Sequence, residues 1–352
     1  MSRDINIGSK KIGYGQPVFV IAEAGVNHNQ QLDIALKLVD TAADCGADAV
    51  KFQTFKTEDV VTEKGEMALY QKKNTGTRMS QREMLKGLEL PDDFYDPIIR
   101  RCNKKGILFM STPHGGKKSV DLLEELGVKA YKIGSGDLTN YILLDRVART
   151  GKPMILSSGM ATLDEVKDAV GFVKSRGNTQ IAMLHCTTNY PCPPEEVNLL
   201  AMKKMMKELD IPIGYSDHTQ GSQVAIMAAT LGMAIYECHF TLDKTLPGPD
   251  HIASVEPDEL KDKIAAIRRV NIILGKYEKV PNESEISSMI PLVRRSIVAV
   301  ANLSKGHIIT DADIEAKRPG TGVSPSQYEK FLGRVVKNTL KADQQITFKD
   351  IE

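Results

Sequence analysis

The sequence lacks an excess of charge of either sign, because 46 Lys and Arg residues stand against 45 Asp and Glu residues in a chain of 352. Without a net field, the chain has no general attraction for nucleic acid or for an anionic membrane surface. It also lacks any apolar run that reaches the roughly 18 residues of a membrane-spanning helix. We therefore expect neither nucleic acid nor a membrane among its partners.

Cysteine is scarce and shows no pairing pattern, since there are five residues, an odd number without close spacing. Such cysteines are typical of small buried side chains in a reducing compartment. The first residues, MSRDINIGSKKIGYGQP, contain no apolar segment of the kind that forms the centre of a secretion signal. Together these absences predict a cytoplasmic protein.

What the sequence does contain is a regular alternation of short apolar runs with stretches of helical period. The helical stretches often end in glycine, a common helix stop, and Thr162 with Glu165 forms the pattern of a helix start. Strands separated by helices cannot pair as hairpins, so the sheet is predicted to be parallel. Candidate strands, rich in Val, Ile and Phe, occupy 18–25, 48–55, 107–113, 130–137, 153–160, 179–188, 212–218 and 234–241.

Eight strand–helix units predict a (β/α)8 TIM barrel over residues 18–276. The alternative is an open doubly wound sheet, which would carry a glycine-rich phosphate turn after its first strand; EAGVNHN is not that turn. Residues 1–17 predict a small hairpin that plugs the barrel bottom. Residues 277–289 are polar and contain a proline, as linkers do, and 290–352 predict a small β-rich domain.

Polar side chains appear where each predicted strand ends. Barrel enzymes place their reactive groups at the carboxyl ends of the strands, so these side chains predict an active site at that mouth. The residues are Glu23, Lys51, Gln53, Ser111, Thr112, Lys132, Ser135, Asp137, Ser157, Ser158, His185, Thr187, Ser216, His218, Glu237 and His239.

His218 and His239 lie one strand–helix–strand step apart and therefore on neighbouring strands. Two inward imidazoles on adjacent strands can hold one divalent ion through their neutral nitrogens. Glu23 and Asp250 are available as hard partners, which suits an open Mn²⁺, Co²⁺ or Fe²⁺ site better than a closed Zn²⁺ site. The alternative is that each histidine is an ordinary hydrogen-bonding residue.

Lys51 and Lys132 lie within strands and are expected to face the barrel interior. A buried lysine is costly unless an anion meets it, and hydroxyls and amides surround both positions. The pattern favours a cradle for an anion that carries both carboxylate and phosphate. The alternative is a Schiff-base lysine of a pyruvate aldolase. Asp250 could hold sugar hydroxyls or belong to an ordinary turn, and Arg318 by itself predicts a solvated loop residue.

Ten stretches in order along the chain resemble the sialic acid synthases, which make nonulosonic acids from phosphoenolpyruvate and an N-acylated amino sugar. The stretches are IAEAGVNHN, KFQTFK, STP, KIGSGD, SSGM, HCTTNYP, GYSDHT, HFTLDK, PGPDHIAS and KRPGTG. The resemblance implies a (β/α)8 barrel followed by a small antifreeze-like (SAF) domain. It also implies a domain-swapped homodimer in which that domain covers the partner's barrel mouth.

The resemblance assigns roles to matching positions. It implies that His218 and His239 hold a divalent metal, commonly Mn²⁺, with Co²⁺ or Mg²⁺ as alternatives. Glu23 would be the catalytic carboxylate that positions or deprotonates the water, and Asp137 stands where many members have Glu. Arg318 would reach the sugar from the partner chain. The implied phosphoenolpyruvate ligands are Lys51, Gln53, Thr112, Lys132, Ser135, Ser157 and Ser216; the implied sugar contacts are Asn74, Tyr190 and Asp250.

The sugar itself stays open between two members of one class. N-acetylmannosamine would give N-acetylneuraminate, and 2,4-diacetamido-2,4,6-trideoxymannose would give N,N'-diacetyllegionaminate. Thr188 and residues 293–296 depart from positions that contact the sugar in some members, whereas LPGPDH speaks against the pseudaminic branch. A Schiff-base aldolase is the rival enzyme, and a carbohydrate- or ice-binding protein is the rival outside catalysis.

Overall fold

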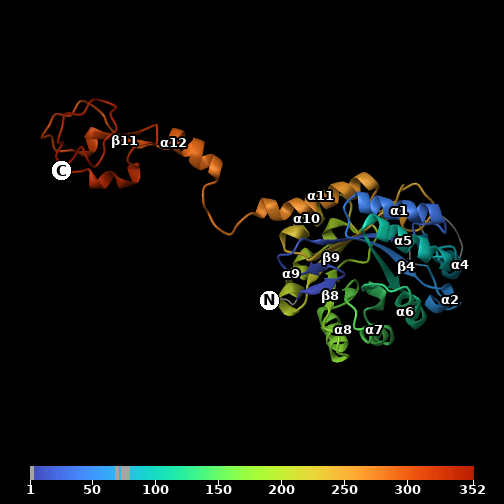
Figure 1. The fold of residues 1–352 in the computed structure, drawn as a ribbon. Coiled ribbons are helices and arrows are strands. Elements are labelled where there is room, and N and C mark those ends of the chain that lie inside the picture. Colours follow the sequence, from blue (N-terminus) through green and yellow to red (C-terminus); the bar gives the residue numbers. More distant parts are fainter. Residues whose placement is uncertain (1–3, 68–70, 73–79) are drawn as a thin grey trace. The chain divides into compact units, whose positions relative to one another are not determined.

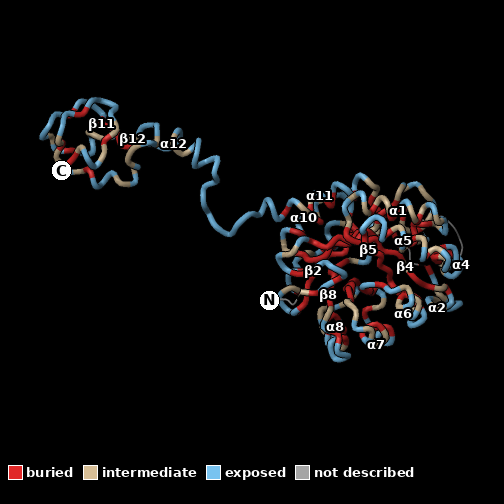
Figure 2. The backbone as a smooth tube through the Cα atoms, viewed as in Figure 1, coloured by how far each residue is buried: buried red, intermediate tan, exposed pale blue. Residues whose placement is uncertain are grey.

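The computed structural model describes residues 4–67, 71–72 and 80–352 (Figure 1). The chain forms two compact units, Met1–Gly275 and Lys276–Glu352. Residues 271–289, which connect them, are all exposed (Figure 2). Each unit has its own hydrophobic core.

The first unit is the predicted (β/α)8 barrel. Its sheet has eight strands in the order β5-β4-β3-β10-β9-β8-β7-β6, and the paired neighbours are parallel. β5 and β6 stand at the two ends of this order and lie against each other, which nearly closes the barrel. The strands are β3 (Phe19–Gly25), β4 (Ala49–Thr54), β5 (Leu108–Pro113), β6 (Tyr131–Ile133), β7 (Met154–Ser157), β8 (Ile181–His185), β9 (Ile213–Asp217) and β10 (Ile235–His239).

Helices follow the strands and cover the outside of the sheet (Figure 1). Thr162 and Glu165 form the capping box that the sequence predicted at the start of α8. The helices are α1 (Leu32–Asp44), α5 (Tyr95–Lys105), α6 (Gly116–Glu125), α7 (Tyr141–Ala148), α8 (Leu163–Ser175), α9 (Leu199–Glu208), α10 (Gln223–Thr230) and α11 (Pro257–Leu274), with the short α2 (Thr57–Val60) and α4 (Gln81–Lys86) near the mouth. The described part of the chain contains no helix that is long and apolar enough to cross a membrane.

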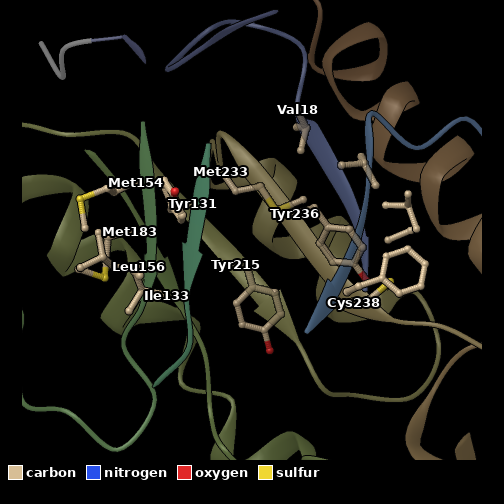
Figure 3. Close-up of a cluster of buried hydrophobic side chains, with 14 of the residues drawn as sticks. Val18, Tyr131, Ile133, Met154, Leu156, Met183, Tyr215, Met233, Tyr236 and Cys238 are labelled. Carbon is tan, nitrogen blue, oxygen red and sulfur yellow. The ribbon is translucent and has the colours of Figure 1, made fainter. Parts of the chain in front are cut away.

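Alternation along each strand separates two environments. Outward residues such as Tyr215, Tyr236 and Cys238 pack under the helices in the main core (Figure 3). The inward residue Ile235 belongs to a second cluster with Phe19, Ile21 and other lumen residues. Since side chains alternate, the next inward positions on β3 and β10 are Glu23 and Glu237. The strand pattern therefore delivers charged groups into the barrel above an apolar floor.

A short hairpin completes that floor. β1 (Ile5–Ile7) pairs antiparallel with β2 (Lys10–Ile12), and Ile5, Ile7 and Ile12 are fully buried among the inward residues of the barrel. These side chains fill the lumen at the amino ends of the strands. The polar residues at the carboxyl ends therefore surround a pocket with a closed bottom.

The second unit is small and β-rich. β11 (Ser296–Ala299) pairs antiparallel with β12 (Ile314–Lys317), and isolated bridges tie further segments to them. A core that includes Ile297, Phe331 and Ile346 holds the unit together. A π-helical turn at Glu285–Met289 and α12 (Ile290–Val293) lie in the same unit, before β11.

Candidate active site

The carboxyl ends of the barrel strands surround one cavity of about 240 Å³. Most of the predicted site residues line it, although they come from strands far apart in the sequence. These are Glu23, Lys51, Gln53, Thr112, Lys132, Ser135, Ser157, Tyr190, Ser216, His218, His239 and Asp250. Because side chains alternate along each strand and the hairpin closes the amino ends, the inward charged residues gather at the carboxyl ends of the strands.

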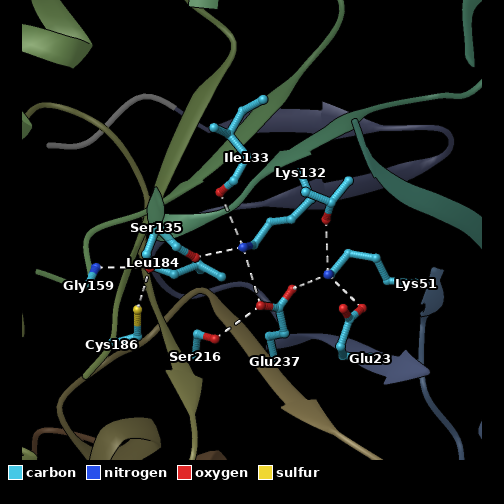
Figure 4. A network of polar contacts seen from close by, with 12 residues as sticks. Glu23, Lys51, Lys132, Ile133, Ser135, Gly159, Leu184, Cys186, Ser216 and Glu237 are labelled. Carbon is cyan, nitrogen blue, oxygen red and sulfur yellow. Dashed lines mark hydrogen bonds and ion pairs between the residues drawn. The ribbon is translucent and has the colours of Figure 1, made fainter. Parts of the chain in front are cut away.

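Two buried lysines occupy the centre of the site (Figure 4). The Lys51 ammonium lies 2.5 Å from Glu23 Oε2 and donates to Thr112 Oγ1 at 3.1 Å. The Lys132 ammonium donates to Ser157 Oγ at 2.6 Å. Both lysines also face Glu237, at 3.8 Å from Lys51 and 3.3 Å from Lys132. The protein's own carboxylates thus meet the two cations that we expected a bound anion to meet.

Sequence reasoning gave Glu237 no role, although it is the carboxylate that bridges the lysines. It is buried, and Ser216 on the neighbouring strand donates to it at 3.0 Å. Its position shares a strand face with His239, so the alternation that selected the histidine also points to Glu237. What the sequence could not supply is which lysine would reach it across the barrel.

The two carboxylates differ in their electrostatics. Burial alone would raise the pKa of Glu237, but Lys132 and Lys51 outweigh it and lower that pKa to about 2. For Glu23, burial dominates and raises the pKa, with Glu237 adding to the effect and Lys51 opposing it. Glu237 is therefore the charged partner, and Glu23 holds a proton more readily than an ordinary glutamate does. Two ammonium groups share one firmly charged carboxylate, which leaves positive charge for an anionic ligand.

The two histidines lie at the same mouth. The ring centroids of His218 and His239 are 5.6 Å apart, and the Tyr190 ring lies 4.1 Å from that of His218. Burial lowers the pKa of both histidines to about 4, so both are neutral near pH 7. His218 Nδ1 lies 2.6 Å from the carbonyl oxygen of Thr187, to which it can donate. Its Nε2 then carries the lone pair.

These donors fit a catalytic divalent metal with open positions. His239 Nδ1 is buried without a hydrogen-bond partner among the described residues, and it lies 4.0 Å from Asp250 Oδ2. Within residues 4–67, 71–72 and 80–352, no group of three or more His, Cys, Asp or Glu side chains is arranged to hold an ion. Two neutral imidazoles would therefore leave the remaining positions to substrate and water, as catalytic metal sites do.

Comparison with known proteins places this geometry in a family. The model described as the NeuB family matches residues 38–279, and that of the SAF domain matches residues 294–352. The N,N'-diacetyllegionaminic acid synthase of Campylobacter jejuni is 44% identical over 329 residues, 93% of this chain and 98% of that protein. The chain belongs to the NeuB family.

Other NeuB-family relatives are similar over nearly their whole length. The N,N'-diacetyllegionaminic acid synthase of Legionella pneumophila is 43% identical, covering 100% of this chain and 99% of that protein. The human N-acetylneuraminate-9-phosphate synthase is 35% identical, covering 95% and 93%. The crystal structure of the N-acetylneuraminic acid synthetase from Leptospira borgpetersenii has a TM-score of 0.73 and 36% identity, covering 82% and 96%.

Two described residues to which the resemblance gave a role, Asp137 and Arg318, do not line the cavity of this NeuB-family chain. Asp137 does not line the cavity; it faces His114 at 3.2 Å and accepts from Asn140 at 3.0 Å. Arg318 is exposed in the second unit, where its Nε donates to the Val293 carbonyl at 3.1 Å. Asn74 lies outside the described residues. The five cysteines are free, as the composition predicted, and four of them are buried.

One wall of the cavity is apolar. It is formed by Val26 after β3 and by Met84, Leu85 and Leu88 in and after α4. Val26, Met84 and Leu88 belong to a small hydrophobic cluster of their own, so the wall is packed from behind. Asp250 stands on the polar side, where burial first and Glu23 second raise its pKa to about 7.

Proposed function

We propose that this chain condenses phosphoenolpyruvate with an N-acylated amino sugar to give a nonulosonic acid and phosphate. One observation carries the proposal: a single cavity joins two buried lysines that share one charged carboxylate with a pair of neutral histidines. The lysine side offers charge for an anion, and the histidine side offers neutral nitrogens for a metal. A Schiff-base aldolase would need the lysine but gives no reason for the histidine pair.

Phosphoenolpyruvate is proposed to bind on the lysine side. Lys51 and Lys132 supply the positive charge, and the hydroxyls of Thr112, Ser157 and Ser216 lie beside them in the cavity. Charged donors together with small hydroxyls suit a ligand that carries both phosphate and carboxylate. Binding would shift the lysines from the protein's carboxylates toward the ligand.

His218 and His239 are proposed to hold the divalent metal, Mn²⁺ first, with Co²⁺ or Mg²⁺ as alternatives. When bound, the metal would supply Lewis-acid polarisation of the open-chain aldehyde of the sugar. Asp250 and Tyr190 lie next to the histidines, where they can orient the hydroxyls of the sugar.

Carbon 3 of phosphoenolpyruvate then bonds to the aldehyde carbon, and the aldehyde oxygen takes up a proton. We propose Glu23 as the donor of this proton, because burial raises its pKa above that of an ordinary glutamate and Lys51 and Gln53 fix its position. This role replaces the deprotonation of water that we expected from the sequence. Water adds to carbon 2, and phosphate leaves by cleavage of the bond between carbon 2 and oxygen.

Two features favour 2,4-diacetamido-2,4,6-trideoxymannose as the sugar. The relatives at 44% and 43% identity are N,N'-diacetyllegionaminic acid synthases. The apolar wall of Val26, Met84, Leu85 and Leu88 suits a 6-methyl group, whereas the 6-hydroxyl of N-acetylmannosamine would lose hydrogen bonds to water there. N-acetylmannosamine, the first expectation from the sequence, is therefore the second candidate.

A phosphate-release assay with phosphoenolpyruvate and either sugar, with and without Mn²⁺, tests the function. We expect Mn²⁺-dependent release with the diacetamido sugar and slower release with N-acetylmannosamine. Absence of release with both sugars under all metal conditions would reject the proposed reaction. Borohydride trapping of a lysine with pyruvate would instead support the aldolase.

A further inference from the structure

A histidine–carboxylate pair stands at the cavity on the side away from the two metal-binding histidines. His114 is the first residue after β5 and lines the cavity, and its Nδ1 lies 3.2 Å from Asp137 Oδ2. Asp137 ends the short 3-10 turn Ser135–Asp137 and does not line the cavity. The imidazole therefore stands between the cavity and a carboxylate behind it.

The surroundings of Asp137 fix its charge. Burial would raise the pKa of this carboxyl, but the contacts with His114 and Asn140 outweigh burial and lower it. A carboxylate only accepts hydrogen bonds, so Nδ1 of His114 must carry the proton of the shared hydrogen bond. In the neutral ring the lone pair then belongs to Nε2. Nε2 makes no hydrogen bond within the described residues, so it is available to a ligand.

Local packing fixes the orientation of the ring. A Cβ added to Gly134 would lie 2.8 Å from His114 Cε1, closer than a side chain tolerates. Glycine at this position lets the imidazole lie against the backbone that leads into Ser135. Thr112 and Ser135, two of the proposed phosphoenolpyruvate ligands, line the same cavity as His114.

The other acid–base candidates on this side are already engaged. Glu237 is held by Lys132 and Ser216, and Glu23 by Lys51 and Gln53. Both side chains are therefore hydrogen-bonded within the protein before any ligand binds. Nε2 of His114 makes no such contact within the described residues, and histidine is the side chain that most often serves as a general base.

We propose that His114 is the base that deprotonates the water that adds to carbon 2 of phosphoenolpyruvate, and that Asp137 is its positioning residue. This inference rests on the proposed function. The water oxygen forms a bond to carbon 2 while its O–H bond breaks, and the proton passes to Nε2 of His114. Asp137 stabilises the imidazolium that results. The proton returns to the phosphate oxygen as the bond between carbon 2 and oxygen breaks. The carbon 2 hydroxyl gives its proton to Glu23, which had donated its own to the aldehyde oxygen, and becomes the carbonyl group. His114 and Glu23 therefore both end the cycle in their starting protonation states.

The test uses steady-state phosphate release by full-length His114→Gln, Asp137→Asn and the double variant. Removal of a general base costs about 10²- to 10⁴-fold in kcat. We expect such a loss for His114→Gln, with KM for phosphoenolpyruvate changed by less than about threefold, because binding does not use the base. Asp137→Asn should lower kcat about tenfold or more, because an amide can impose the other tautomer.

The double variant decides whether the two residues act together. If Asp137 works only through His114, Asp137→Asn should have no further effect on kcat in the His114→Gln background. A structural role of Asp137 would instead lower kcat equally in both backgrounds and would overturn the pairing. His114→Phe, which keeps an aromatic ring, replaces His114→Gln if the latter unfolds. Lys117→Gln, at an exposed position in the first turn of α6, is the control.

The remaining outcomes also discriminate. The inference would be overturned if His114→Gln and His114→Phe both kept a kcat within about threefold of wild type. A rise in KM without a fall in kcat would also overturn it, because His114 would then contribute only to substrate binding. Failure of the wild-type protein to release phosphate with either sugar would reject the proposed function itself. If the wild type releases phosphate and the His114 variants have the same kcat, only the role of His114 is rejected.

Discussion

The buried ion pair behind β9 gives a sharp test of how this site is held. Asp217 lies between Ser216 and His218 and points outward, where Lys263 of α11 donates to its Oδ2 at 3.1 Å. The side chains are 3% exposed for Lys263 and 0% for Asp217. Tyr236 donates to the same oxygen at 2.7 Å. The strand end that carries Ser216 and His218, the proposed ligands of phosphoenolpyruvate and of the metal, is thus fixed by one buried carboxylate.

We predict that Lys263→Met lowers the free energy of unfolding by about 3 kcal/mol. Loss of one partner of a buried pair costs about 3–5 kcal/mol, because the other charge stays buried without compensation. The lower end applies because Tyr236 and Thr219 still donate to Asp217. Asp217→Asn combined with Lys263→Met should recover part of the loss, since the double variant buries no unpaired charge.

Urea unfolding followed by circular dichroism at the helix band measures the effect, because most helices belong to the barrel unit. Lys261→Met is the matched control: the residue is exposed on the same helix, so its loss should change stability by less than about 0.5 kcal/mol. A Lys263→Met protein within about 1 kcal/mol of wild type would refute the reasoning. A double variant that loses the sum of both single effects would refute it as well.

Three further predictions follow from the charges described above. Glu237→Gln should leave Lys51 and Lys132 without the charged carboxylate that they share. We expect a lower melting temperature than wild type without ligand, and a larger rise in melting temperature when phosphoenolpyruvate is added. A rise equal to that of wild type would contradict this expectation. Thr310 and His307 lower the pKa of Asp313 to about 2 from its ordinary 3.8, so the stabilisation of the second unit by Asp313 is present above pH 4 and is lost as the pH falls toward 2. Asp313→Asn should therefore lower the melting temperature of the 276–352 unit at pH 7 but not near pH 2. A difference in melting temperature that does not depend on pH would contradict this role of Asp313. If Arg318 acts in the partner's site, Arg318→Ala and Lys132→Ala should each be inactive alone and recover phosphate release when co-expressed, whereas lack of recovery in mixed dimers would argue against the exchange.

The sequence predicted the barrel well because period-2 and helical-period patterns are local. The strand expected at 48–55 is β4 at Ala49–Thr54, and that at 18–25 is β3 at Phe19–Gly25. The strand expected at 130–137 ends early, at Ile133, because Gly134 leads into the 3-10 turn that carries Asp137. That turn moves Asp137 behind the cavity wall, which no periodic pattern could indicate.

The sequence predicted most of the residues that gather around the cavity, but not how they pair. Alternation along a strand fixes which face a side chain occupies, so Lys51, Lys132 and the histidines could be placed in the lumen. Which carboxylate meets which lysine depends on the distance across the barrel, and this made Glu237 invisible as a bridge. His114 escaped notice for the same reason, since its role depends on a neighbour from the next strand's loop.

The isoleucine-filled hairpin below the lumen has a consequence for the order of events. Because the hairpin closes the barrel at the amino ends of the strands, reactants and products pass through the mouth at the carboxyl ends. Lys51 and Lys132 lie deep, at 3% exposure each, whereas Tyr190 and Asp250 lie nearer the rim. In the proposed reaction, phosphoenolpyruvate should therefore bind before the sugar, because the bound sugar would block access to the two lysines. By the same reasoning, the nonulosonic acid should dissociate first and inorganic phosphate should dissociate last.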